Sequence, residues 1–172
     1  MKWLLMAGIV LACLIAVVVV TGMLLPKAHV ATRSSRLKYP PEAVWALIAG
    51  DQSWRPDVRR YEKLPDRGGR RTWKETSKHG TITFEMVESD QPRRLITRIA
   101  DTGLPFGGSW TYQIVPEAGG CSIEITERGE VYNPVFRFVS RFIMGHTASI
   151  DAYLSALEKR LEEGGQSRGA GM

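Results

Sequence analysis

The sequence contains few of the residues from which metal sites, disulfides and catalytic centres are built. Its 172 residues include only three histidines and two cysteines. The histidines are dispersed and lack the spacing of zinc ligands, so neither a metal nor another cofactor is predicted. Cys13 lies in a long apolar run and Cys121 in an alternating strand pattern, so we do not expect an internal disulfide.

Motifs for nucleophilic catalysis and nucleic-acid binding are missing as well. Ser109, Ser140 and Ser149 lack the context of a nucleophile elbow. Residues 107–108 (GG) precede neither a Lys-Ser/Thr pair nor a helix start, which favours a bulge or a close backbone approach over phosphate binding. The Lys and Arg residues are scattered and no recognised nucleic-acid motif accompanies them, so nucleic acid is not an expected partner.

The longest feature that is present is an uncharged run that begins at Trp3 and ends at Leu25. As a helix it would be roughly 34 Å long, and the hydrocarbon core of a bilayer is about 30 Å thick. We therefore predict a transmembrane anchor over residues 1–26, which Pro26 ends. A cleaved signal peptide is the alternative, although its apolar region is usually about 7–15 residues long. The side of the membrane that holds the rest of the chain stays open.

Positive charge is concentrated after this run. Residues 27–78 hold 13 Lys and Arg against 6 Asp and Glu, and the whole chain has a net charge of +5. Basic residues beside a span fit contact with anionic headgroups, each contributing about 1 kcal/mol. A solvated basic face is an equally good interpretation.

Residues 27–163 have the length and patterning of one domain. The pattern predicts a strand over residues 29–37, a short helix over residues 41–50, and then about six antiparallel strands between residues 59 and 132. The polar, glycine-rich residues 164–172 are predicted to be a disordered tail.

One long helix is predicted over residues 133–163, with Asn133 as its N-cap and Pro134 as its first residue. Apolar residues recur along it at steps of three and four. This stripe consists of Val135, Val139, Phe142, His146, Ile150, Tyr153, Leu157 and Leu161. Because a curved antiparallel sheet has one apolar face to cover, we expect this helix to lie across it, in an α+β fold.

Three segments resemble the START-like superfamily, also called SRPBCC or polyketide-cyclase-like. They are residues 41–45 (PEAVW), 104–112 (LPFGGSWTY) and 126–134 (TERGEVYNP), and with the strand spacing the match covers nearly all of residues 29–162. The chain looks like a membrane-anchored bacterial member, which implies a single-pass protein of the inner membrane. The resemblance also implies the helix-grip fold, a curved antiparallel sheet wrapped around the C-terminal helix.

The resemblance further implies a cavity between sheet and helix, because members bind lipids, sterols, polyketides or hormones there. A minority are enzymes, and no catalytic set is common to the superfamily. We expect nine residues to line the cavity, although ordinary core filling is the alternative for each. They are Trp45, Trp73, Phe84, Met86, Trp110, Tyr112, Val139, Phe142 and His146.

Two residues are candidates for acid–base chemistry. His146 falls on the inward stripe of the long helix, where a single core hydrogen bond is the simpler interpretation. Glu127 is in phase with Ile123 and Ile125, so it is expected to point inward near one mouth of the cavity and to need a partner. His29 and His79, at a strand start and a hairpin turn, are expected to be exposed.

These observations predict a binding module, anchored in the membrane, for a hydrophobic or lipid-like small molecule. A cyclase, dehydratase or hydrolase that uses His146 or Glu127 is the second hypothesis. A domain without a functional cavity is the third.

Overall fold

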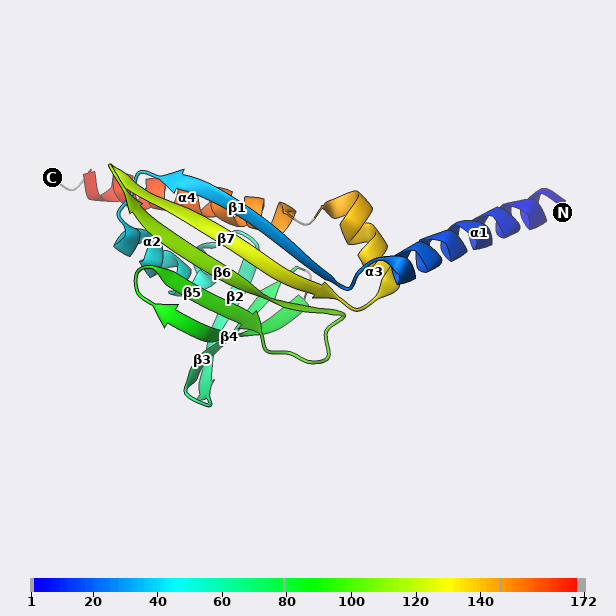
Figure 1. Cartoon of the computed structure of the whole chain (residues 1–172), viewed down its shortest axis with the longest axis horizontal. Helices are drawn as coiled ribbons and strands as arrows, with labels where there is room; N and C mark the ends of the chain where they lie inside the picture. The colour runs from blue at the N-terminus through cyan, green and yellow to red at the C-terminus, as the bar shows by residue number, and fades with distance from the viewer. Residues whose placement is uncertain (1, 79, 146, 170–172) are drawn as a thin grey trace.

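The structure is a computed structural model that describes residues 2–78, 80–145 and 147–169. Helix α1 (Lys2–Leu24) extends away from an α+β domain (Figure 1). The elements of the domain, in chain order, are β1 (Ala28–Leu37), α2 (Pro41–Ile48), the 3-10 turn η1 (Gln52–Trp54), β2 (Val58–Arg67), β3 (Arg70–Ser77), β4 (Gly80–Asp90), β5 (Arg94–Ile99), β6 (Phe106–Glu117), β7 (Gly120–Val131), α3 (Pro134–Val139), the π-helical turn η2 (Ser140–Met144) and α4 (Ala148–Gly169).

The seven strands form one antiparallel sheet in the order β1-β7-β6-β5-β4-β3-β2. Strands β1 and β2 therefore lie at opposite edges, and α2 and η1 carry the chain from one edge to the other. Along β7, Cys121, Ile123 and Ile125 are buried, whereas Glu124 between them is exposed. This alternation gives the sheet one apolar face.

Helix α4 covers that apolar face (Figure 1). Ile150 and Leu157 on α4 are completely buried, as are Ile123 and Ile125 on β7. At the edge of the sheet, the Arg33 Nε of β1 donates to Asp151 Oδ1 of α4 at 3.0 Å. The predicted helix-grip fold is confirmed.

The prediction of one continuous helix from residue 133 onward is wrong for the first half of that segment. Asn133 is the N-cap as expected, since its Oδ1 accepts from the Phe136 N–H at 3.1 Å. However, α3 ends at Val139, η2 follows, and Gly145 has a φ of 74° that separates η2 from α4. A left-handed φ interrupts an α-helix and is adopted readily by glycine. At the other end, α4 continues to Gly169, beyond the predicted end at Gly164 and into the segment predicted to be disordered.

The apolar stripe consequently does not continue along α3 and η2. Val135 is 44% exposed and Phe142 is 59% exposed, and the neighbouring Ile143 is 72% exposed. The sheet therefore buries the apolar side of α4 but leaves apolar side chains on α3 and η2 uncovered.

Helix α1 is long and apolar enough to cross a membrane, by length and composition. Its C-terminal end packs closely against α3. A Cβ on Gly22 would lie 2.0 Å from the Pro134 carbonyl oxygen, so the contact requires glycine. In addition, Arg137 Nη1 donates to the Leu25 carbonyl at 2.9 Å. These two contacts hold the end of α1 against the domain.

Candidate functional site

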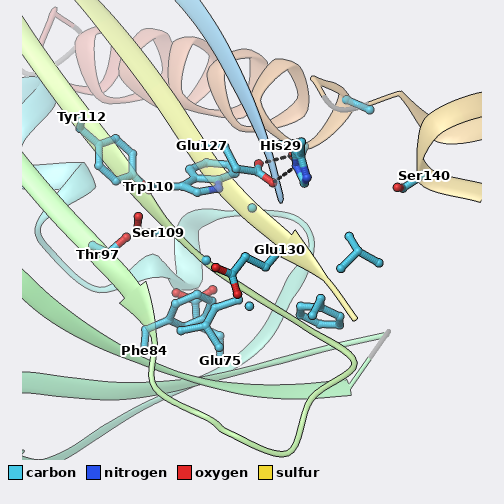
Figure 2. Close-up of a pocket in the computed structure, with 18 of the residues that line it drawn as sticks. His29, Glu75, Phe84, Thr97, Ser109, Trp110, Tyr112, Glu127, Glu130 and Ser140 are labelled. Atoms are coloured by element: carbon cyan, nitrogen blue, oxygen red, sulfur yellow. Dashed lines mark hydrogen bonds and ion pairs between the residues drawn. The ribbon is translucent and has the colours of Figure 1, made fainter. Parts of the chain in front are cut away.

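A cavity of about 410 Å³ lies between the sheet and the segment that runs from α3 into α4 (Figure 2). This volume is within the range of small-molecule sites, about 300–1,000 Å³. Its apolar wall is largely aromatic, and the Trp73 and Phe84 rings are stacked with their centroids 5.7 Å apart. The aromatic residues that line it are Trp73, Phe84, Phe106, Trp110, Tyr112 and Phe136.

Of the residues predicted to line the cavity, the structure places Trp73, Phe84, Trp110 and Tyr112 on its wall. The other predicted residues that the structure describes do not line the cavity. Trp45 belongs to α2 and is buried in the core, and Met86 packs against the same core.

The predicted cavity residues on the C-terminal helix also differ from the prediction. Val139 is half-buried outside the cavity lining, and Phe142 is exposed, because η2 and Gly145 change the direction of the chain. His146 lies outside the described residues. Phe136 and Ser140, which were not predicted, supply the cavity wall from α3 and η2.

One end of the cavity is lined by the polar side chains of Gln52, Arg55 and Glu75. Together with Tyr153, which contacts Gln52 and Arg55, they form a group that we call the inner cluster. Arg55 Nη1 donates to Glu75 Oε2 at 3.0 Å, and Trp73 Nε1 donates to Glu75 Oε1 at 2.8 Å. The Arg55 guanidinium also lies 5.3 Å from the centre of the Tyr153 ring, within range of a cation–π interaction. Both carboxylate oxygens of Glu75 are therefore engaged.

Burial and neighbouring charges together set the protonation of the inner cluster. Burial raises the pKa of Glu75 even though Arg55 and the Trp73 N–H favour the carboxylate. Burial alone would lower the pKa of Arg55, but the hydrogen bond to Asp57 and the charges of Glu75 and Asp57 outweigh it and raise that pKa. Burial also raises the pKa of Tyr112. The Tyr112 hydroxyl therefore stays protonated and is able to donate.

Gln52 connects the inner cluster to helix α2. Its Nε2 donates to the Leu47 and Ile48 carbonyls, at 2.9 and 3.1 Å. Its Oε1 accepts from the Tyr153 hydroxyl at 3.3 Å. The glutamine thus satisfies carbonyls at the end of α2 and orients a tyrosine of α4 at the same time.

The other end of the cavity holds a second polar group, His29, Glu127 and Ser149, which we call the outer cluster. His29 Nε2 and Glu127 Oε1 are 3.3 Å apart (Figure 2). Ser149 Oγ donates to Glu127 Oε2 at 3.0 Å. The three residues come from β1, β7 and α4. All three line the cavity.

The β1–β7 register explains how His29 reaches this position. His29 lies opposite Gly129, and Ala31 lies opposite Glu127. A Cβ on Gly129 would lie 2.3 Å from His29 Cε1, so the absence of a side chain leaves the space that the imidazole occupies. The prediction that His29 is exposed is wrong, because its environment depends on a strand about 100 residues later. The glycine opposite it was the available signal.

Gly108 shows the close backbone approach that its sequence context favoured. It lies opposite Gly129 with a φ of 142°, and a Cβ there would lie 2.4 Å from the Arg128 carbonyl oxygen. The glycine pair therefore allows β6 and β7 to approach closely beside the outer cluster.

The cavity thus combines an aromatic wall with hydrogen-bonding groups at both ends. This arrangement is suited to a mostly apolar molecule that carries a few polar groups. Among the described residues, no group of three His, Cys, Asp or Glu side chains is placed to hold a metal ion.

Comparison with known proteins agrees with this geometry. Residues 28–162 match the family described as polyketide cyclase / dehydrase and lipid transport. This match spans more than half of the sequence, and the chain belongs to that family. No curated protein matches the sequence significantly.

Solved structures share the fold at low sequence identity. Protein MLL2253 from Mesorhizobium loti is 15% identical, with a TM-score of 0.59 over 78% of this chain and 98% of that one. Norcoclaurine synthase from Thalictrum flavum is 16% identical, with a TM-score of 0.61 over 79% and 87%. The di-domain ARO/CYC protein StfQ from the steffimycin biosynthetic pathway is 11% identical, with a TM-score of 0.63 over 81% of this chain and 52% of that one. The chain therefore spans about half of StfQ.

Proposed function

We propose that this protein binds an apolar small molecule with a few polar groups in the cavity, and that α1 anchors it in a membrane. The observation that carries the proposal is the cavity itself, about 410 Å³ with an aromatic wall and polar groups at its ends. An apolar ligand gains free energy by leaving water, at about 25 cal/mol per Å² of buried apolar surface. Polar groups that line the cavity then select the ligands that are able to hydrogen-bond with them.

The membrane anchor and the cavity support each other in this proposal. Lipid-like molecules are scarce in water and concentrated in bilayers, so a binding domain beside a bilayer meets more of them. Helix α1 has the length and composition of a span. Family membership and the structural neighbours support a small-molecule binding module, and the lipid character of the ligand is our inference.

Native mass spectrometry of the detergent-extracted chain tests the proposal. We expect an apolar molecule to remain bound to the wild type and to be lost from Ser109→Phe, which adds an aromatic ring to the cavity wall. Val115→Phe is the matched control, since Val115 is 56% exposed on the same strand and does not line this cavity. No bound molecule in the wild type, or equal retention by Ser109→Phe, would contradict the proposal.

A second candidate function is acid–base catalysis on the bound molecule, as in the cyclase or dehydrase activities that the family description names. The observation that favours it is the His29–Glu127 pair on the cavity wall, with Ser149 orienting the carboxylate. Histidine exchanges protons readily near neutral pH, and a hydrogen-bonded carboxylate holds its ring in place.

Comparison of bound molecules distinguishes catalysis from binding alone. An enzyme whose Glu127→Gln variant is inactive is expected to retain an unconverted substrate, whose mass differs from that of the molecule retained by the wild type. A dehydration would give a difference of one water. Identical masses in both proteins would favour the binding module.

A further inference from the structure

A second hollow of about 330 Å³ lies where α1 meets the domain, between the start of β1 and α3, and we call it the basic groove. It is distinct from the cavity, although His29, Val131 and Ser140 line both. Its lining includes Lys27, Arg137 and Arg141 as well as His29, and among the described residues it includes no Asp or Glu. A concave site with cations and no carboxylate attracts anions.

Arg137 is the buried member of the groove, only 7% exposed. Its Nη1 and Nη2 donate to two backbone carbonyls, those of Leu25 and Tyr132, at 2.9 and 3.2 Å. Its Nε has no hydrogen-bond partner among the described residues, and none of their carboxylates forms an ion pair with the guanidinium. Buried charges are normally paired, because desolvation of an isolated ion is costly. The contact with Leu25 is explained by capping of the C-terminal end of α1. It does not supply a negative charge to balance that of Arg137.

Lys27 and Arg141 add two exposed cations to the same groove. Neither takes part in an ion pair within the part of the chain that the structure describes. Directly after Arg141, the side chains of Phe142 and Ile143 are 59% and 72% exposed. Apolar surface is therefore close to the groove, since α1 ends beside Leu25 of its lining and two exposed apolar residues follow Arg141 in η2.

We propose that the basic groove binds the phosphate of an anionic phospholipid whose acyl chains lie along α1 and against Phe142 and Ile143. Arginine matches phosphate through parallel N–H donors, and lysine adds a mobile point charge. The apolar surfaces of α1 and η2 near the groove favour a lipid over a soluble phosphate. This inference rests on the proposed insertion of α1 in a bilayer.

The test compares lipid retention in the wild type and a charge-neutralised variant. The whole chain is reconstituted in nanodiscs of phosphatidylethanolamine and phosphatidylglycerol, and the lipids it retains are identified by native mass spectrometry. Lys27→Gln combined with Arg141→Gln is the variant, because both side chains are exposed and the fold does not depend on their described contacts. Arg59→Gln combined with Lys63→Gln is the control, with the same loss of charge on exposed positions of the edge strand β2.

We expect the wild type and the control to retain phosphatidylglycerol, and the groove variant to retain about tenfold less. Equal retention by the groove variant would overturn the proposal. An equal loss in the control would also overturn it, since retention would then reflect net charge alone. A further sample contains excess inorganic phosphate, and displacement of the lipid by that ion would show a soluble phosphate site instead of a lipid site.

Failure of this inference is distinguishable from failure of the proposed function. The groove variant is expected to keep the molecule bound in the cavity, and Ser109→Phe is expected to keep phosphatidylglycerol. Loss of phosphatidylglycerol from Ser109→Phe would place the lipid in the cavity and overturn the groove site. If the wild-type cavity is empty but lipid retention still depends on the groove residues, the proposed function is contradicted and the lipid site in the groove is supported.

Discussion

The inner and outer clusters both centre on a glutamate whose two oxygens are engaged, but the partners differ in kind. Glu75 is paired with Arg55, which is charged at all physiological pH values, and its side chain is 8% exposed. Glu127 is paired with His29, a residue type whose charge changes near neutral pH, and its side chain is 18% exposed. The comparison teaches that two glutamates with the same number of contacts can lie in different electrostatic surroundings. The glutamate of the inner cluster faces a permanent cation and an indole N–H, whereas the glutamate of the outer cluster faces an imidazole and a hydroxyl.

The largest expected effect tests whether the charges of the inner cluster depend on each other. Arg55→Met removes the cation beside buried Glu75 and should lower the free energy of unfolding by about 3–5 kcal/mol. Urea denaturation in detergent, followed by circular dichroism, measures the loss. Arg60→Met is the control, because Arg60 pairs with Glu62 at the surface and is 74% exposed. A loss no larger than that of the control would mean that Glu75 is neutral in the folded protein.

A smaller effect is expected from crowding the outer cluster. Gly129→Ala places a Cβ against the His29 ring, which must move away from Glu127, at a cost of about 1–3 kcal/mol. The thermal midpoint measures the cost, and the NMR signals of the His29 ring report its displacement. Gly103→Ala is the matched control, since a Cβ there meets nothing within 4 Å. Unchanged His29 signals in Gly129→Ala would contradict the described packing.

The pH dependence of stability tests the buried glutamate of the inner cluster. Because burial raises the pKa of Glu75, the folded state holds its proton more tightly than the unfolded state does. The resulting stabilisation is present below the ordinary value of 4.5 and is lost as pH rises through the raised pKa. Each unit of displacement corresponds to about 1.4 kcal/mol. Urea midpoints measured from acid to neutral pH should therefore fall more steeply for the wild type than for Glu75→Gln, and parallel curves would contradict the assignment.

The smallest effect is expected at the helix end of the outer cluster. Ser149→Ala removes the hydrogen bond to Glu127 Oε2, which contributes about 0.5–1.5 kcal/mol, while alanine partly compensates through its higher helix propensity. Ser149→Ala is therefore measured in the wild type and again in a Glu127→Ala background, because the propensity change is the same in both. The difference between the two shifts in urea midpoint isolates the contact. A zero difference would show that Ser149 does not orient Glu127.

The sequence was sufficient to predict the sheet and the packing of α4, because both depend on local periodicity. The alternation in β7 and the spacing of Ile150, Tyr153, Leu157 and Leu161 repeat over many residues, and these side chains are buried. The prediction of one continuous helix was wrong at Gly145, where a single residue interrupts the helical spacing of apolar residues. Gly145 lies inside an apolar pattern, and its positive φ redirects the chain, so Phe142 is exposed instead of facing the cavity.

The candidate site was only partly predictable, for a related reason. Trp73, Phe84, Trp110 and Tyr112 are aromatic residues on strands, and strand alternation is enough to suggest that they face inward. Arg55 and His29 carry no such signal. Arg55 follows a short 3-10 turn and contacts Glu75 twenty residues later, and the position of His29 depends on its register with Gly129. Contacts of this kind are set by tertiary structure, which a single sequence does not show.

The strand order also has a consequence for synthesis of the protein. Strand β1 has one neighbour in the sheet, β7, and its residue Ala28 pairs with Glu130. A ribosome must therefore add about a hundred residues after β1 before that strand finds its partner, and such distant pairing slows folding. Throughout this interval the edge of β1 is unprotected, and the outer cluster is assembled only when the end of the chain arrives.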